Sequence, residues 1–127
     1  MKISDVIEFV NAIKPNAFSE AAQVGWLNEA EGQVAINIFL FAADEVPVYT
    51  WPECADFELL AQPPHDKLYG AYLTAMTDFA NGEYNKYQNT MQVYNAHYSE
   101  FMRWFASTFR PADTHSGVYT SGMPDEF

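Results

Sequence analysis

A long segment without proline or glycine constrains the fold of this chain more than any other feature. It covers residues 83–110, and its large apolar side chains recur in steps of three and four residues. Because an α-helix has 3.6 residues per turn, these steps keep the side chains on one stripe of a helix. The stripe consists of Tyr84, Tyr87, Met91, Tyr94, Tyr98, Phe101 and Phe105. The sequence therefore predicts one amphipathic helix of about seven turns over residues 83–110.

The same stripe is compatible with two kinds of helix packing. A heptad pattern is typical of coiled coils, but this one is short and is rich in Tyr and Phe rather than Leu and Ile. These properties favour a small helical bundle. The polar side of the predicted helix carries more amides than charges, including Gln88, Gln92 and Asn95. Since such a side suits a neighbouring protein as well as water, these three residues are candidates for an interface.

Length and composition favour one compact domain. The chain has 127 residues, of which 49% are hydrophobic and 17% aromatic, so a modest core of large rings is expected. The single cysteine, Cys54, excludes an intrachain disulfide and favours a reducing compartment. The N-terminal stretch is interrupted by polar residues where a signal peptide needs an apolar run. The most apolar segment, residues 34–43, is about half as long as a membrane span, so we expect a soluble protein without a membrane partner.

The charge of the chain is strongly negative and unevenly distributed. The net charge is −11, with eleven acids and two bases in residues 1–66 and six acids and four bases in residues 67–127. A field of this sign repels phosphate backbones, so ordinary nucleic-acid binding is not expected. The acidity can serve solubility alone, or it can serve a surface that must lie near DNA without sticking to it. Both interpretations stay open at the level of sequence.

A first helix is predicted near the N-terminus. Ser4 supplies an N-cap, Asp5 and Glu8 place acids in the first turn, and Pro15 stops the helix after Lys14. A residue before proline is disfavoured in the α region, which agrees with this end. One apolar stripe of this helix consists of Ile3, Val6, Ile7, Val10 and Ile13.

A second helix is predicted over residues 20–42, with Ser19 as its N-cap. It contains Gly25 and Gly32, and each glycine costs about 1 kcal/mol relative to alanine inside a helix. We therefore expect another backbone to approach closely at these positions, with a kink as the alternative.

The middle of the chain is predicted to be irregular. Four prolines occur within residues 44–64. Residues 46–51 and 56–60 alternate between apolar and polar types, which predicts two short strands or extended segments and hence an irregular or short β-hairpin insertion.

A third helix is predicted after Pro63 and Pro64, ending at Asn81 and Gly82. Because the connection to residues 83–110 is so short, the two helices should form an antiparallel αα-hairpin. The side chains expected to face the long helix are Leu68, Tyr72, Met76 and Phe79.

The composition changes after Arg110. Residues 111–127 contain two glycines, two prolines and no periodicity, which predicts an extended C-terminal tail that orders only against a partner. Its apolar residues are suited to anchoring in partner pockets. These are Val118, Tyr119, Met123 and Phe127. The predicted fold is thus a mainly α bundle over residues 1–110 with a long last helix and a hairpin insertion, followed by this tail.

Few residues suggest catalysis or metal binding. His97 and Glu100 share a helix face, but a di-iron bundle needs a Glu-x-x-His motif on each of two helices and carboxylates from two more. Cys54 lies near Glu53 and Asp56, whose charges would raise the pKa of its thiol and oppose a nucleophilic role. The sequence contains neither a phosphate-binding glycine loop nor a nucleophile elbow. We therefore expect no catalytic residue, no metal site and no cofactor.

Several segments, taken in order, resemble a known protein family. They are VNAIKPN, WLNEAEGQV and ELLAQPPHDKLYGAYLTAMTDFANGEYNKYQNTMQVYNAHYSEFMRWF. Together they look like the small head-tail connector proteins, also called adaptors or head-completion proteins, that tailed phages encode beside their portal and capsid genes. The resemblance covers roughly residues 6–111 and rests on the order of the segments rather than on one motif. Residues 112–127 lie outside it.

The resemblance implies a mostly helical structural subunit of the virion, without catalytic residues. Such subunits form a homo-oligomeric ring on the portal, matching its symmetry, and link the DNA-filled capsid to the next neck or tail-completion protein. DNA would pass through the channel of the ring without specific binding. The implied location is the neck of the virion, after assembly in the cytoplasm of the bacterial host.

Two other functions remain as alternatives. An acidic decoy that mimics DNA would explain the charge, but a mimic should space carboxylates along its exposed faces. Residues 83–110 contain only Glu83 and Glu100 as acids. The second alternative is another small helical interaction protein of bacterial regulation.

Overall fold

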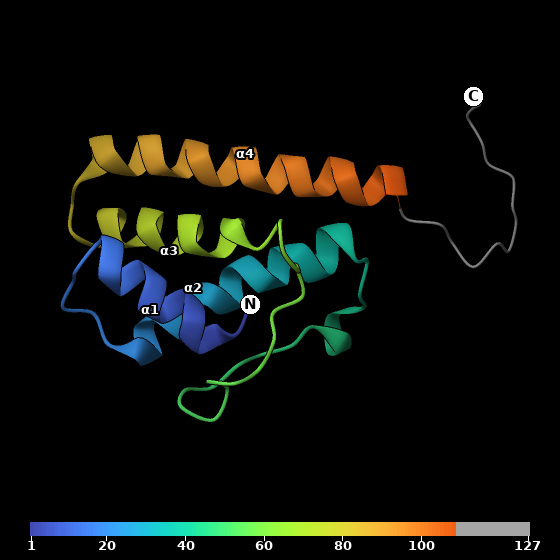
Figure 1. Ribbon diagram of the computed structural model, residues 1–127, viewed down its shortest axis with the longest axis horizontal. Coiled ribbons are helices and arrows are strands. Elements are labelled where there is room, and N and C mark those ends of the chain that lie inside the picture. Colours follow the sequence, from blue (N-terminus) through green and yellow to red (C-terminus); the bar gives the residue numbers. More distant parts are fainter. Residues whose placement is uncertain (109–127) are drawn as a thin grey trace, which may run out of the picture.

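The computed structural model describes residues 1–108, and this part of the chain is a bundle of four α-helices (Figure 1). The helices are α1 (Ile3–Ile13), α2 (Glu20–Gln33), α3 (Lys67–Ala80) and α4 (Tyr84–Thr108). The prediction of a mainly helical fold is confirmed. The predicted tail and its interface candidates Val118, Tyr119, Met123 and Phe127 lie outside the described residues.

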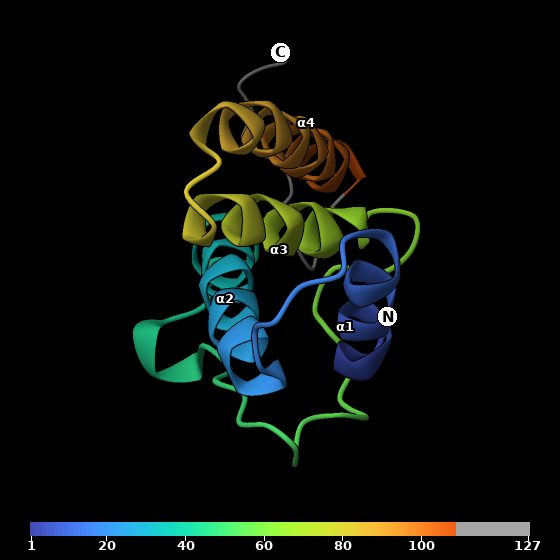
Figure 2. The same ribbon diagram turned by 90° about the vertical axis from the view of Figure 1, so that its left-hand side faces the viewer.

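Helix α3 is the central layer of the bundle. Figure 2 shows α4 on one side of α3 and both α1 and α2 on the other. Because α3 is covered from both sides, Leu68, Tyr69 and Leu73 are fully buried. The predicted antiparallel hairpin of α3 and α4 is also confirmed, and Gly82 makes its tight turn with a φ of +76°. This conformation favours glycine, which has no Cβ.

The apolar stripe of α4 packs on the core, but less deeply than its length suggests. Tyr94 and Phe101 are buried, and Tyr94 lies with its ring centroid 4.9 Å from that of Tyr72 in α3. The other stripe residues are half-buried or exposed. Phe79 was expected on the inner face but is 48% exposed, because its ring packs only at the edge of the bundle, where its aromatic neighbours both come from the start of α4. Helix α4 therefore packs on the surface of the bundle, with one side on α3 and the other side exposed.

Helix α1 begins one residue before the predicted cap. Its N-cap is Lys2, and Ser4 lies inside the first turn. The backbone N–H groups of Ile3 and Ser4 donate to the carbonyl oxygens of Phe57 (3.1 Å) and Ala55 (3.0 Å). Since these distant carbonyls satisfy N–H groups that a helix leaves free at its start, no side-chain cap is needed there.

Helix α2 begins at the predicted place and ends earlier than predicted. The hydroxyl of Ser19 accepts a hydrogen bond from the Ala22 N–H at 3.2 Å, as an N-cap should. After Gln33 the chain continues as a π-helical turn (Val34–Ile38) and stops at Leu40, which has a φ of +60°. Helices often end on a glycine in this left-handed conformation. The predicted extension to residue 42 is wrong, because Leu40 takes up the left-handed conformation and interrupts the helix there.

The glycines of α2 do not have the predicted role within the described subunit. A Cβ atom built on Gly25 or Gly32 would meet no atom within 4 Å. The close approach occurs instead at Gly70 of α3, where an added Cβ would lie 3.3 Å from two ring carbons of Phe9. Gly70 therefore lets α1 pack tightly against α3.

The predicted β-hairpin is wrong. Within residues 1–108 no strand forms, and the β-type pairing is a single bridge between Lys2 and Glu58. Within the irregular segment, residues 39–66, the backbone hydrogen bonds are local turns, and its longer-range bonds go to the N-terminal residues and to α2. The Leu59 N–H donates to the Met1 carbonyl, and the Tyr49 N–H donates to the side chain of Asn28 in α2.

Replacing Phe101 by alanine tests whether α4 is part of the folded core. Phe101 is 2% exposed, so Phe101→Ala should lower the free energy of unfolding by about 3–5 kcal/mol and the Tm by more than about 10 °C. The neighbouring Met102 is 39% exposed, and Met102→Ala should have a much smaller effect in the same thermal melt. Equal melting temperatures for the two variants would show that α4 is not docked on α3.

Leu40 offers a test of the unusual end of the second helix. A left-handed conformation costs a residue with a Cβ roughly 1–2 kcal/mol, and glycine avoids this cost while losing more freedom on folding. Leu40 is 78% exposed, so little packing is lost on truncation. Leu40→Gly should therefore raise the free energy of unfolding by up to about 1 kcal/mol relative to Leu40→Ala. Denaturant titrations of both variants would measure the difference, and a less stable glycine variant would contradict it.

Candidate interaction surface

The three amides predicted as interface residues lie together on the exposed side of α4. Gln88, Gln92 and Asn95 are spaced by four and three residues, so they share one face of the helix, and all three are exposed. Between its first and last residues α4 carries only the charges of Lys86, Glu100 and Arg103. This amide face is thus exposed and nearly neutral, although the chain as a whole is strongly acidic.

The exposed acids gather elsewhere on the molecule. No Lys or Arg occurs between Lys14 and Lys67, and this stretch contains nine acids. Five exposed acids belong to the irregular segment and to the short helix Ala43–Glu45 within it. They are Asp44, Glu45, Glu53, Asp56 and Glu58. Figure 1 shows most of this segment on the opposite side of the bundle from α4. The two sides of the subunit therefore differ strongly in charge.

An apolar groove of about 470 Å³ lies between α1, α3 and α4. Three of its apolar side chains are half in water, with exposed fractions of 50% for Phe9, 57% for Ile13 and 51% for Val93. Gly70 forms part of the floor, beneath the Phe9 ring. The remaining lining residues are Met1, Val6, Asp66, Lys67, Ala71, Thr74, Thr90 and His97. The groove can therefore accept apolar side chains but offers few polar groups to orient a ligand.

A buried carboxylate in α3 ties together the helices that form this groove. The Lys14 ammonium, just beyond the end of α1, lies 2.5 Å from Asp78 Oδ1. The Thr90 hydroxyl in α4 donates to Asp78 Oδ2 at 3.1 Å. Asp78 is fully buried, so removing its charge would leave Lys14 without its partner. The ion pair thus joins the end of α1 to α3, and the Thr90 hydrogen bond joins α4 to α3.

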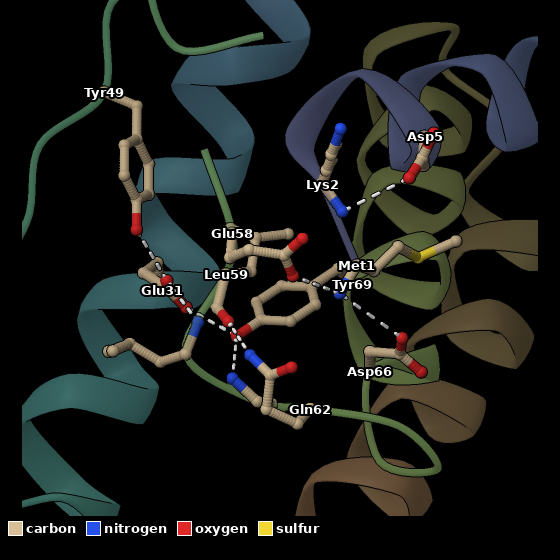
Figure 3. A network of polar contacts seen from close by, with 12 residues as sticks. Met1, Lys2, Asp5, Glu31, Tyr49, Glu58, Leu59, Gln62, Asp66 and Tyr69 are labelled. Atoms are coloured by element: carbon tan, nitrogen blue, oxygen red, sulfur yellow. Dashed lines mark hydrogen bonds and ion pairs between the residues drawn. The ribbon is translucent and has the colours of Figure 1, made fainter. Parts of the chain in front are cut away.

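A second buried carboxylate, Glu31 of α2, organises the irregular segment (Figure 3). Its Oε2 accepts hydrogen bonds from the Tyr49 hydroxyl at 2.8 Å and from the Leu60 N–H at 2.9 Å. Its Oε1 accepts one from the Tyr69 hydroxyl of α3 at 2.5 Å. The same hydroxyl accepts from the Ala61 N–H at 2.8 Å. The network joins α2 and α3 to two parts of the irregular segment, around Tyr49 and around Leu60.

Burial shifts the titration of the tyrosines that take part in such contacts. Loss of hydration raises the pKa values of Tyr49 and Tyr69 far above the usual range, and the nearby Glu31 charge raises them further. Burial also raises the pKa of Tyr72, whose hydroxyl donates to Glu29 at 2.7 Å, and that of Tyr94. All four hydroxyls are therefore held as neutral hydrogen-bond donors.

Cys54 and His97 lie in different parts of the fold, Cys54 in the irregular segment and His97 in α4. Cys54 is buried, and burial raises the pKa of its thiol more than the charge of Glu53 does. His97 is a half-buried lining residue of the groove. Within residues 1–108, no three His, Cys, Asp or Glu side chains come close enough to hold a metal ion. None of the helices in this part of the chain combines the length and apolar character needed to cross a bilayer.

No family model, curated protein or solved structure matches the chain significantly.

The groove was not anticipated from the sequence. Phe9 and Val93 lie off the main apolar stripes of their helices, and such off-stripe apolar residues were the available signal. They come from segments more than eighty residues apart, so only the packing of α1 and α4 around α3 brings them together.

The tyrosine shifts predict how stability depends on high pH. The pKa values of these tyrosines in the folded state are raised above the unfolded value of about 10. The contribution of their neutral hydroxyls to the free energy of unfolding is therefore fully present below pH 10 and is lost as the pH rises above it. We expect a pH titration of tyrosinate absorbance to show Tyr49, Tyr69, Tyr72 and Tyr94 ionising only as helical circular dichroism disappears. Tyr69→Phe should remove one of these late ionisations. Complete ionisation of all tyrosines with the helical signal intact would contradict the prediction.

Proposed function

We propose that the protein is a structural head-tail connector of a tailed phage. In this role a ring of identical subunits sits on the portal and links the filled capsid to the next neck or tail-completion protein. The observation that carries the proposal is the two-sided subunit, in which the exposed, nearly neutral amide face of α4 lies opposite an acidic irregular segment. The resemblance over roughly residues 6–111 supports the same role.

The charge distribution suits passage of DNA through such a ring. Exposed acids repel the phosphate backbone, and a channel wall of this kind does not retain DNA. The acidic side of the subunit would line the channel or face solvent. The amide face would then be free to contact another protein.

A closed ring needs two different complementary patches on each subunit, since neighbouring copies meet through heterologous contacts. The amide face with Gln88, Gln92 and Asn95 is our candidate for one patch. Residues 111–127, with their four apolar anchors, would supply contacts to neighbours, the portal or the next neck protein. The function requires neither catalysis nor a cofactor.

The distribution of acids weighs against the decoy alternative. A DNA mimic needs carboxylates spaced along a regular surface, and α4, the longest regular surface of the described chain, contains Glu100 as its only acid. The acids of the irregular segment follow no regular spacing. A regulatory interaction protein would use the same amide face and is distinguished by experiment.

Disruption of the gene in its phage tests the proposal. The expected result is heads that contain DNA but lack tails, with the protein present in wild-type virions at several copies per neck. Electron microscopy of the particles and mass spectrometry of purified virions would measure both. Tailed, infectious particles at normal yield without the protein would contradict the connector role.

A matched pair of variants then tests the amide face. The triple variant Gln88→Glu, Gln92→Glu and Asn95→Asp changes three exposed amides to carboxylates of nearly the same shape. It should fold normally, since all three side chains are exposed, but should lower the yield of tailed particles because charges at an interface must be desolvated. Asn37→Asp adds a charge at an exposed amide just beyond α2 and should leave the yield unchanged. Normal yields from both variants would remove the amide face from the interface.

A further inference from the structure

The groove between α1, α3 and α4 exposes a group of large apolar side chains to solvent. Phe9, Ile13 and Val93 each leave about half of their surface in water, and all three line the same depression. Grouped apolar exposure of this kind marks surfaces that another segment covers. The helices around the groove are joined by Asp78, which contacts both Lys14 and Thr90.

The lining of the groove includes an exposed positive charge. Lys67 lines it and is exposed, and within residues 1–108 it forms neither a salt bridge nor a side-chain hydrogen bond. The neighbouring Asp66 also lines the groove, but its carboxylate lies 3.8 Å from the Met1 ammonium. A segment with acidic residues beside apolar ones would match both the apolar lining of the groove and Lys67.

We propose that the C-terminal segment of the same chain, residues 111–127, occupies this groove in the free subunit. Its apolar residues Val118, Tyr119, Met123 and Phe127 fit the floor, and Asp125 and Glu126 between the last two fit Lys67. The glycines and prolines of the segment allow it to follow an irregular surface. This inference does not depend on the connector role.

The length of the chain permits this docking. Val93 precedes Thr108, the last described residue of α4, by fifteen residues, or about 22 Å along the helix. Val118 follows Thr108 by ten residues, which can span up to about 33–36 Å. Every apolar anchor can therefore reach back to the groove of its own subunit. A tether this short gives an effective concentration of about millimolar, so docking within the chain prevails over docking between copies in dilute solution.

Disulfide trapping in the full-length protein tests the proposal. Ser121→Cys places a thiol between the apolar anchors without removing one of them, and Val93→Cys places its partner in the groove. The matched control combines Ser121→Cys with Gln92→Cys, which has almost the same tether length but lies on the amide face. Cys54 stays in place, because its thiol is buried. The reaction is followed at micromolar protein under mild oxidant by gel mobility and peptide mass mapping.

We expect an intrachain disulfide between positions 93 and 121 that forms about tenfold or more faster than the one between positions 92 and 121. Lys67→Glu should slow the first reaction, and adding Asp125→Lys and Glu126→Lys should restore it. Equal rates at positions 92 and 93 would overturn the proposal, as would disulfides that form mainly between chains. Since the purified protein alone is used, failure here would leave the connector role untouched, and failure of the phage experiment would leave this result untouched.

Discussion

The buried carboxylate of Glu31 is the interaction on which the arrangement of the chain depends. An ionised side chain in the interior is costly unless hydrogen-bond donors surround it, and here two tyrosine hydroxyls and one backbone N–H do so. The donors come from α3 and from the long segment that connects it to α2. That segment forms little regular secondary structure of its own, so its hydrogen bonds to the Glu31 carboxylate help to fix its conformation. This conformation in turn satisfies the start of α1, through the carbonyls of Ala55 and Phe57.

A fixed connection on one side leaves the other side of α3 available for α4. Helix α4 packs on α3 through the buried rings of Tyr94 and Phe101, with Met91, Tyr98 and Phe105 half-buried beside them, and through the bond from Thr90 to Asp78. Its other side remains exposed to solvent along its whole length. The amide face and the groove are both products of this placement. One lies on the outside of α4, and the other lies where α4 fails to cover α1 completely.

The elements that depend on nearby residues were predicted correctly from the sequence, whereas those that depend on distant residues were not. The periodicity of residues 83–110, the Ser19 cap and the turn at Gly82 depend on neighbours within a few residues, and all were found. The path of the irregular segment depends on Glu31 and Asn28, which lie about twenty to thirty residues away, so its alternation suggested strands that do not form. The end of α2 was predicted too late because Leu40 adopts the left-handed conformation, which a sequence usually indicates by a glycine. For the candidate surface, the three amides of α4 were identified in advance, whereas the groove needed the packing of α1 beside α4.

The absence of any Lys or Arg between Lys14 and Lys67 has a consequence for the behaviour of several copies together. Each subunit carries a patch of one sign, so copies that approach side by side repel one another through these patches. The repulsion extends over roughly a Debye length, about 8 Å at physiological ionic strength, and shrinks as salt is added. Association of this protein with itself should therefore strengthen with ionic strength, opposite to the behaviour of contacts held by ion pairs. Multivalent cations, which gather near dense negative charge, would favour it further.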